Sequence, residues 1–390
     1  AGEFEGRFAF ARFDCRAVQF QRAAGEFIRA DRADIARKDD ACMGFAYHQI
    51  CAYNTISCQF QKAAFTAQKA LRYYRAAGGR ERSVQNVLRY AAMAEMLRGN
   101  AGEANRLVSV AEQVIGGDAF ESAAARVELL LLSGDYSAAL TLIDRALSGV
   151  EGDRAARRAV GLDLKLKALW QLCDWKAMAP VARELLAAGS PSDSAASQAH
   201  AMLALALRSG ASVDEADESF RQAEFFADRV RNDFDRVDAL RTLALCRAMA
   251  GDRRKAETTA REGLVAGLRH SAYWQTFTLL TIMAESMLER GRSEEARFFL
   301  LEASYLFTAG TLLPAKDAIL YYHLASRLLD TASAAANRSV ALRLLEDEKA
   351  RIRDPDLVAA FLSVRSFAAV QRELESEAGE KARAAEDHSE

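Results

Sequence analysis

Small residues recur along the chain at fixed distances from a turn position, with larger apolar residues between them. In one copy the turn residue Gly134 is followed by an aromatic residue, Tyr136, and by alanines five and twelve residues later, Ala139 and Ala146. Seven residues make about two turns of an α-helix, so both alanines lie on one helix face, where they let a neighbouring helix approach closely. The pattern predicts one helix that ends at the glycine and a second helix that follows and packs against it.

The same spacing occurs at eight places. The turn positions are residues 18, 58, 99, 134, 173, 210, 251 and 291. The interval between neighbouring positions fits two helices and two turns throughout. One such helix pair cannot bury its own apolar face, so the pairs must stack on one another.

Three places depart from this spacing. Gly210 fits only if its turn contains one extra residue. The copies at 18 and 58 keep the spacing but lack the turn glycine. The copy at 173 also lacks it and has Cys173 there, and Pro180 predicts a kink or a delayed start of its second helix. After residue 310 the copy is poorly defined, and residues 338–349 look like a second helix without a turn glycine.

A turn glycine, an aromatic residue two later and small residues five and twelve later resemble the tetratricopeptide repeat, over about residues 5–310. The long period is similar to that of the variants in bacterial signalling ATPases, adenylate cyclases and maltose-regulator-type transcription activators. The segment 354–362, with its Asp-Pro turn and Phe-Leu, resembles the closing segment of such arrays. The resemblance implies an all-α, right-handed superhelical α-solenoid of about eight to nine repeats over residues 1–350, with a capping helix over 351–376.

The composition agrees with long helices and gives little indication of a charged partner. The chain has 390 residues, only four prolines and a formal net charge of −2, with both signs spread along it. That balance gives no reason to expect binding to nucleic acid or to a membrane surface. Neither a long apolar run nor a secretory signal pattern is present, so we expect a cytoplasmic protein. Residues 377–390 are rich in charge and alanine without an apolar face, and we expect them to be disordered.

The six cysteines do not have the spacing of metal ligands. Cys42, Cys51 and Cys58 lie near His48 in the sequence, which raises the question of a zinc site. On one helix Cys51 and Cys58 would be about 10 Å apart, too far for two ligands of one tetrahedral ion. We therefore interpret the cysteines as small buried residues in a reducing compartment.

No motif predicts catalysis. The sequence lacks phosphate-binding, dinucleotide-binding, zinc-protease, serine-hydrolase and EF-hand patterns, and its histidines are scattered. The pair Glu294 and Glu295 is interpreted as compensation of a helix dipole at a helix start. We predict a protein that is not an enzyme and has no cofactor.

The resemblance implies that the first helix of each pair lines the concave surface, at the positions thirteen, ten, six and three before the turn. The candidate partner-binding residues on that surface are His48, Arg89, Met93, Asp163, Lys167, Trp170, His200, Arg241, Thr281 and Glu285. The basic members, together with Trp170, predict an acidic or polar ligand. The alternative is that these residues form ordinary solvated helix faces.

Aromatic residues form two clusters in the sequence. The first comprises Phe4, Phe8, Phe10, Phe13, Phe20, Phe27, Phe45, Tyr47, Tyr53, Phe60, Phe65, Tyr73 and Tyr74. Terminal repeats normally turn a polar face outward, so this cluster indicates docking on another domain, a second copy or a partner, unless it is a locally heavy core. The second cluster, interpreted as core, comprises Tyr273, Trp274, Phe277, Phe298, Phe299, Tyr305 and Phe307.

Two functional hypotheses remain open at this point. The first is a non-catalytic scaffold or sensor module of a bacterial signalling protein that binds a protein or peptide in a superhelical groove. The second is an arm that senses a small polar molecule for a larger signalling ATPase, cyclase or transcription regulator.

Overall fold

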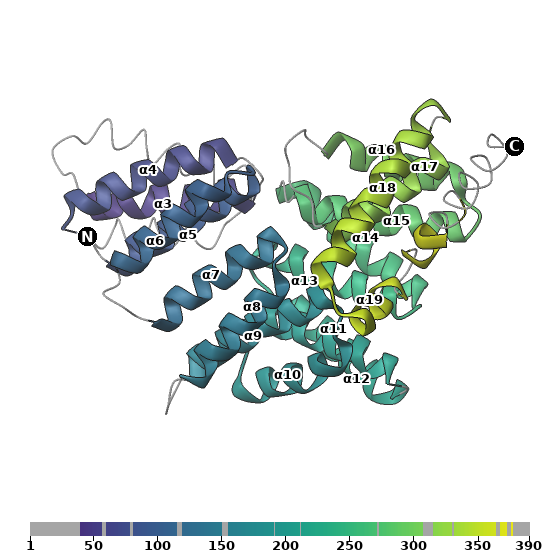
Figure 1. Cartoon of the computed structure of the whole chain (residues 1–390), viewed down its shortest axis with the longest axis horizontal. Coiled ribbons are helices and arrows are strands. Elements are labelled where there is room, and N and C mark those ends of the chain that lie inside the picture. Colours follow the sequence, from purple (N-terminus) through teal and green to yellow (C-terminus); the bar gives the residue numbers. More distant parts are fainter. Residues whose placement is uncertain are drawn as a thin grey trace, which may run out of the picture.

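A computed structural model describes residues 40–56, 60–78, 81–114, 119–149, 155–190, 192–210, 212–270, 273–306, 315–329, 331–363, 367–372 and 376. These residues form helices and turns without a strand, which confirms the predicted all-α array of helix pairs (Figure 1). No helix among them is both long and apolar enough to span a bilayer. The turn position at 18 and the tail 377–390 lie outside the described residues.

The helices alternate as first and second members of pairs. Their bounds are α3 Asp40–Ile56, α4 Phe60–Ala76, α5 Glu81–Leu97, α6 Ala101–Val114, α7 Ala119–Ser133, α8 Tyr136–Ser148, α9 Ala155–Leu172, α10 Trp175–Ala188, α11 Asp193–Ser209, α12 Val213–Arg229, α13 Asp233–Met249, α14 Arg253–His270, α15 Tyr273–Glu289, α16 Ser293–Leu306, α17 Ala315–Leu328, α18 Thr331–Ile352 and α19 Pro355–Leu362. From α3 to α18 the odd-numbered helices are the first helices and the even-numbered ones the second helices.

In several pairs the two helices are joined by a tight turn that contains a left-handed residue. Gly134 has a φ of +83°, and the amide of Asp135 donates to the carbonyl of Leu130 at 2.9 Å. Glycine adopts this conformation without a steric penalty, and the hydrogen bond satisfies a carbonyl at the end of α7. Equivalent positive φ angles occur at Gly99, Gly251 and Gly291.

The turn after α11 lies one residue later than the glycine alone indicates. Its closing hydrogen bond runs from the amide of Ser212 to the carbonyl of Leu207 at 3.0 Å, and Gly210 has a negative φ of −90°. In the Gly134 register the bond would begin at residue 211. The shift agrees with the extra residue needed to reach the buried Ala216.

The degenerate copy forms the same turn without glycine. Cys173 has a φ of +58°, and the amide of Asp174 donates to the carbonyl of Leu169 at 3.1 Å. The Asp174 side chain caps α10, which runs from Trp175 through Pro180 to its end. The start of this helix is therefore not delayed by Pro180.

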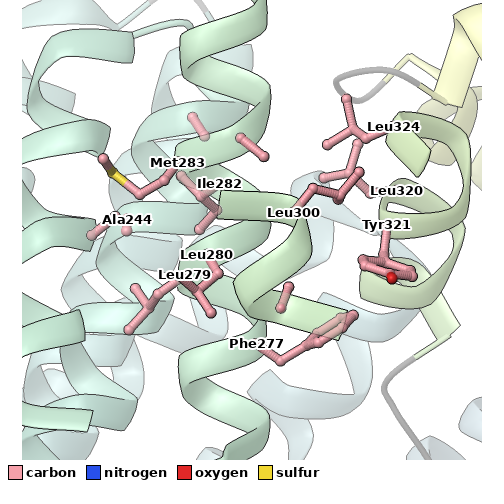
Figure 2. Packing of buried hydrophobic residues seen from close by; sticks show 14 of the residues in the cluster. Ala244, Phe277, Leu279, Leu280, Ile282, Met283, Leu300, Leu320, Tyr321 and Leu324 are labelled. Carbon is pink, nitrogen blue, oxygen red and sulfur yellow. The ribbon is translucent and has the colours of Figure 1, made fainter. Parts of the chain in front are cut away.

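Small residues on the second helices allow close packing against the first helices. Ala296 and Ala303, five and twelve residues after Gly291, have no exposed surface. A Cβ atom added to Gly263 of α14 would lie only 2.8 Å from Leu279 Cδ1 of α15. Figure 2 shows the apolar cluster that fills the remaining space, where Leu300 of α16 lies among side chains of α15 and α17.

The array curves with its first helices on the inner side. Each first helix contacts the first helix of the next pair, from α3 and α5 through to α15 and α17. Within the described part of the chain, no two consecutive second helices make comparable contact. Contact along one side alone requires curvature toward that side (Figure 1).

The last pair packs back onto the middle of the array. At the start of α17, Lys316 Nζ donates to the carbonyl oxygens of Trp170 at 3.3 Å and Gln171 at 2.6 Å, at the end of α9. On α18 the buried carboxylate of Glu348 accepts from the hydroxyl of Tyr136 on α8 at 3.0 Å. We call these hydrogen bonds the closure contact. The repeat spacing did not predict it.

An apolar cluster supports the closure contact. It joins the turn residue Cys173 to residues of α17, α18, α19 and the helical segment 367–372, with Phe361 fully buried. The side chain of Arg351 lies against Gly134, where a Cβ atom would come within 2.9 Å of Arg351 Nε. The φ angle at 134 therefore favours glycine, and a larger residue there would also require the Arg351 side chain to move.

The C-terminal end differs from a single capping helix over 351–376. Helix α18 continues to Ile352, Arg353 adopts a φ of +65°, and Asp354 caps α19 by accepting from the amides of Asp356 and Leu357. After α19, residues 367–372 are helical again. The Asp-Pro pair thus starts a short helix, as Pro in the first turn favours.

The aromatic clusters have mixed environments. Tyr47, Phe60 and Tyr74 are buried in a core of α3 to α5, whereas Phe65 is 58% exposed. The interpretation of the second cluster as core is wrong for Phe298, 56% exposed, and Tyr305, 79% exposed, whereas Phe299 packs against the core. Residues Phe4, Phe8, Phe10, Phe13, Phe20, Phe27 and Phe307 lie outside the described residues.

Candidate binding face on the inner side of the array

Charged side chains of four first helices form a network on the inner side of the array. We call it the inner charge network, and its members are Arg89 on α5, Glu128 on α7, Asp163 and Lys167 on α9, and Asp235, Asp238 and Arg241 on α13. It contains three cations and four carboxylates. Arg89 and Glu128 are joined by hydrogen bonds between α5 and α7, and Lys167 interacts electrostatically with carboxylates of α7, α9 and α13.

The first ion pair of the network joins α5 and α7. Arg89 donates to the Glu128 carboxylate twice, from Nε at 3.2 Å and from Nη2 at 2.5 Å. This bidentate geometry is the strongest arrangement available to the two groups. The side chains retain 27% and 23% of their exposure, so the pair lies at the surface of the inner side rather than in the core.

Lys167 lies among carboxylates from three helices. Its Nζ atom is 2.7 Å from Asp163 Oδ2, one helical turn away on α9. Burial acts to lower the pKa of Lys167, but the carboxylates of Asp163, Asp238 and Glu128 outweigh it and raise the pKa. The side chain still retains 43% of its exposure, so it is surrounded by protein groups while remaining accessible to solvent, as expected on a concave surface.

Arg241 and Asp238 contact each other and also side chains of the two neighbouring first helices. Arg241 donates to Asp238 Oδ1 at 3.0 Å, and its guanidinium group lies 4.8 Å from the ring centre of Trp274 on α15. The second oxygen of Asp238 accepts from Gln198 Nε2 on α11 at 2.8 Å. These contacts connect three consecutive first helices.

Asp235 is the member of the network without an ion pair among the described residues. It lies one helical turn before Asp238 and is exposed. Burial by surrounding groups raises the pKa of Asp235, the like charge of Asp238 raises it further, and Lys167 acts in the opposite direction. Burial raises the pKa of Tyr90 on α5, Arg89 acts to lower it, and the charges of Glu128 and Asp235 raise it further. The network therefore reaches across the inner side from α13 to α5.

The other candidate residues lie at the edge of this network or outside it. His48 is 8% exposed, and its ring centre is 5.8 Å from that of Tyr90. Burial lowers the pKa of His48 to about 4, so the ring is neutral at pH 7. Met93 is partly exposed on α5, while the ring of Trp170 packs edge-on against Trp175 at 5.8 Å, beside the closure contact.

His200 lies outside the inner charge network, because the sequence pattern assigned the inner positions of α11 one residue out of register. Its ring stacks on Phe226 of the second helix α12, with centroids 5.5 Å apart. One residue corresponds to about 100° of rotation around a helix, and the turn after α11 lies one residue later than Gly210 indicates. The expectation for His200 followed from counting back from Gly210.

Thr281 and Glu285 are buried and inaccessible to a partner in this structure. Thr281, 1% exposed, donates to the carbonyl of Phe277 in its own helix. Glu285, 2% exposed, lies 3.6 Å from Arg253 at the start of the second helix α14. The pattern places both at inner positions, but at this end of the array close packing covers them.

The sequence reasoning missed Gln198, Asp235, Asp238 and Trp274. Counted back from Gly251, Asp238 occupies the first of the four positions that the repeat places on the inner side. Asp235 precedes it by one turn, on the same helix face. The spacing therefore carried a signal for both aspartates. The contact between Trp274 and Arg241 depends on the distance between neighbouring helices and has no such signal.

The described thiols and acidic groups are not arranged as metal ligands. Cys51 is fully buried, and burial raises the pKa of its thiol to about 12. Cys58 and the Cys42 side chain lie outside the described residues. Where the structure describes side chains, no three His, Cys, Asp or Glu residues are grouped as metal ligands.

Comparison with known proteins shows a similarity of fold but none of sequence family. No protein-family model and no curated protein sequence matches it. The structure of a Rap protein in complex with competence and sporulation factor is 13% identical, covers 87% of this chain and 99% of its own, and has a TM-score of 0.54. The chain has the fold of a tetratricopeptide-repeat array.

Two other solved structures match this chain with TM-scores below 0.5. A human IFIT1 dimer with PPP-AAAA is 13% identical and covers 80% of this chain and 75% of its own, with a TM-score of 0.47. The tetratricopeptide domain of P58(IPK) is 16% identical and covers 84% and 90%, with a TM-score of 0.19.

Proposed function

We propose that this chain is a non-catalytic interaction module that binds a protein or peptide partner on the inner side of the array. The observation that supports the proposal is the inner charge network. Charged groups of α5 to α13 lie on one face of the array and keep part of their exposure, so a partner can reach them. A surface of this kind recognises the side chains and backbone of a partner through charge-assisted hydrogen bonds.

The remaining features fit such a module. Among the described residues, the ionisable groups with strongly shifted pKa values include Cys51 and Tyr136, and burial is the main cause of both shifts. The thiols of Cys51, Cys173 and Cys246 are free and buried. Free thiols fit a reducing compartment, so we place the module in the cytoplasm.

The test is recovery of binding partners from a lysate of the source cells. The inner-face variant carries Arg89→Glu and Arg241→Glu. The control carries Arg183→Glu and Arg221→Glu, which make the same charge change on the second helices α10 and α12, where both arginines are exposed. We expect the control to recover the same partners as the unmodified chain and the inner-face variant to lose them. Equal recovery by both variants would overturn the proposal.

A further inference from the structure

Three large apolar side chains stay exposed on one face of α16. Phe298 is 56% exposed, Leu301 39% and Tyr305 79%. Their spacing of three and four residues places them on the same side of the helix. Apolar residues that are exposed singly are normal on a protein surface, whereas a contiguous group rimmed by polar residues marks an interaction site.

The charges beside these apolar side chains are acidic. Glu294 lies one helical turn before Phe298, and Glu302 lies one turn after it. Both carboxylates are exposed, and neither has an ion pair with another described residue. The single cation of α16, Arg297, lies about 100° around the helix from Phe298 and therefore at the edge of this face. We call Phe298, Leu301 and Tyr305, together with Glu294 and Glu302, the acidic stripe.

The outer surface of α4 has the opposite charge. Four residues of this helix are basic and none is acidic. Phe65 is 58% exposed, and Lys69 Nζ lies 4.9 Å from the centre of its ring. Arg72 is two helical turns after Phe65 and shares its face, and in the part of the chain that the structure describes neither Arg72 nor Arg75 has an ion pair. We call Phe65, Lys69, Arg72 and Arg75 the basic stripe.

The charges of the two stripes disfavour symmetric pairing and favour a contact between unlike stripes. Two acidic stripes facing each other would repel, and so would two basic stripes. The basic stripe of one copy and the acidic stripe of another attract each other, and each brings an exposed aromatic ring to the contact. Because α4 and α16 lie on different sides of the array (Figure 1), both stripes of one copy can be used at once. We propose that copies of this chain associate head to tail, with the basic stripe of one copy against the acidic stripe of the next.

Sedimentation velocity of the full chain over a series of concentrations tests this contact. The average sedimentation coefficient should rise with concentration and fall when salt is added, because salt screens exposed charges. Arg72→Glu and Glu302→Arg each bring like charges together and should weaken the association roughly tenfold. The matched control, Arg254→Glu, reverses the charge of an exposed arginine of α14 that has no ion pair with a described residue, and it should associate as the unmodified chain does.

A mixture of the two variants distinguishes this pairing from other forms of self-association. The Arg72→Glu chain keeps its acidic stripe and the Glu302→Arg chain keeps its basic stripe, so the mixture should associate more strongly than either variant alone. If it does not, or if Arg254→Glu weakens the association as much, the pairing is wrong. A chain that stays monomeric at every concentration would also overturn it, and the acidic stripe would then belong to a contact with a different protein. All three substituted residues are exposed, so the variants should keep the melting temperature of the unmodified chain.

Discussion

Lys316 Nζ donates to the carbonyl oxygen of Gln171 at 2.6 Å, although 145 residues separate the two in the sequence. The same atom donates to the carbonyl of Trp170. These carbonyls lie in the last turn of α9, where the helix itself supplies few backbone donors. The positive charge at this end also compensates the negative end of the helix dipole.

Lys316→Met should therefore destabilise the closure contact. The apolar stem is retained, but two carbonyls at the end of α9 lose the hydrogen bonds from the ammonium group, at a cost of about 1–3 kcal/mol. The midpoint of chemical denaturation measures the effect. Lys255→Met, which alters an exposed lysine on α14, should change stability by less than about 0.5 kcal/mol. If the two variants lose the same stability, the closure contact is not stabilising.

Tyr136→Phe should be destabilising for a related reason. It removes the hydroxyl that donates to Glu348, whose side chain has no exposed surface. A buried carboxylate oxygen without its donor costs about 1–3 kcal/mol. Tyr305→Phe makes the same chemical change at a residue that is 79% exposed and should have no measurable effect. Thermal unfolding of both variants tests this, and equal melting temperatures would contradict the role given to Tyr136.

Ala139→Leu tests the packing of the repeat. Ala139 has no exposed surface, and three extra carbon atoms there would overpack the helix contact by about 1–3 kcal/mol. Ala187→Leu adds the same atoms at an exposed position of α10 and should cost less than about 0.5 kcal/mol. Comparison of the two denaturation midpoints decides whether position 139 faces the neighbouring helix. An unchanged midpoint for Ala139→Leu would contradict that position.

The lowered pKa of His48 should make the folded chain less stable in mild acid. Its pKa is about 4 in the folded chain and about 6.5 when unfolded, so between these values the unfolded state binds more protons. Stability should then fall as the pH decreases from 6.5 toward 4, with His48 contributing on the order of 3 kcal/mol over that interval. His48→Gln should reduce the slope of stability against pH in this window. If the slopes of the variant and the unmodified chain coincide, His48 does not titrate as described.

Much of the helical organisation could be predicted because it is encoded locally. The distance from Gly134 to Ala139 is the same in most copies, and each copy specifies its own turn and helix contact. The ambiguity at Gly210 shows the limit of this local reading. A glycine alone does not define the register. The one-residue error placed His200 on the inner side, whereas its ring stacks on Phe226 of α12.

The inner side could be predicted only in part. The spacing correctly places Arg89, Lys167 and Arg241 on first helices, but their partners depend on the distance between helices. The basic residues therefore suggested an acidic ligand, although each is already paired. The return of α17 onto α9 could not be predicted either. It depends on small rotations between pairs that accumulate over several repeats, and no single repeat determines their sum.

The closure contact changes the mechanical character of the array. In an open stack of repeats, force or unfolding at one end passes through each pair in turn. Here Lys316 and Glu348 connect the last pair directly to the pairs of Gln171 and Tyr136, so that several intervening pairs are enclosed in a loop of noncovalent contacts. These contacts therefore restrain the bending of the middle of the array. A partner that bends it must either leave the hydrogen bonds of Lys316 and Glu348 intact or break them.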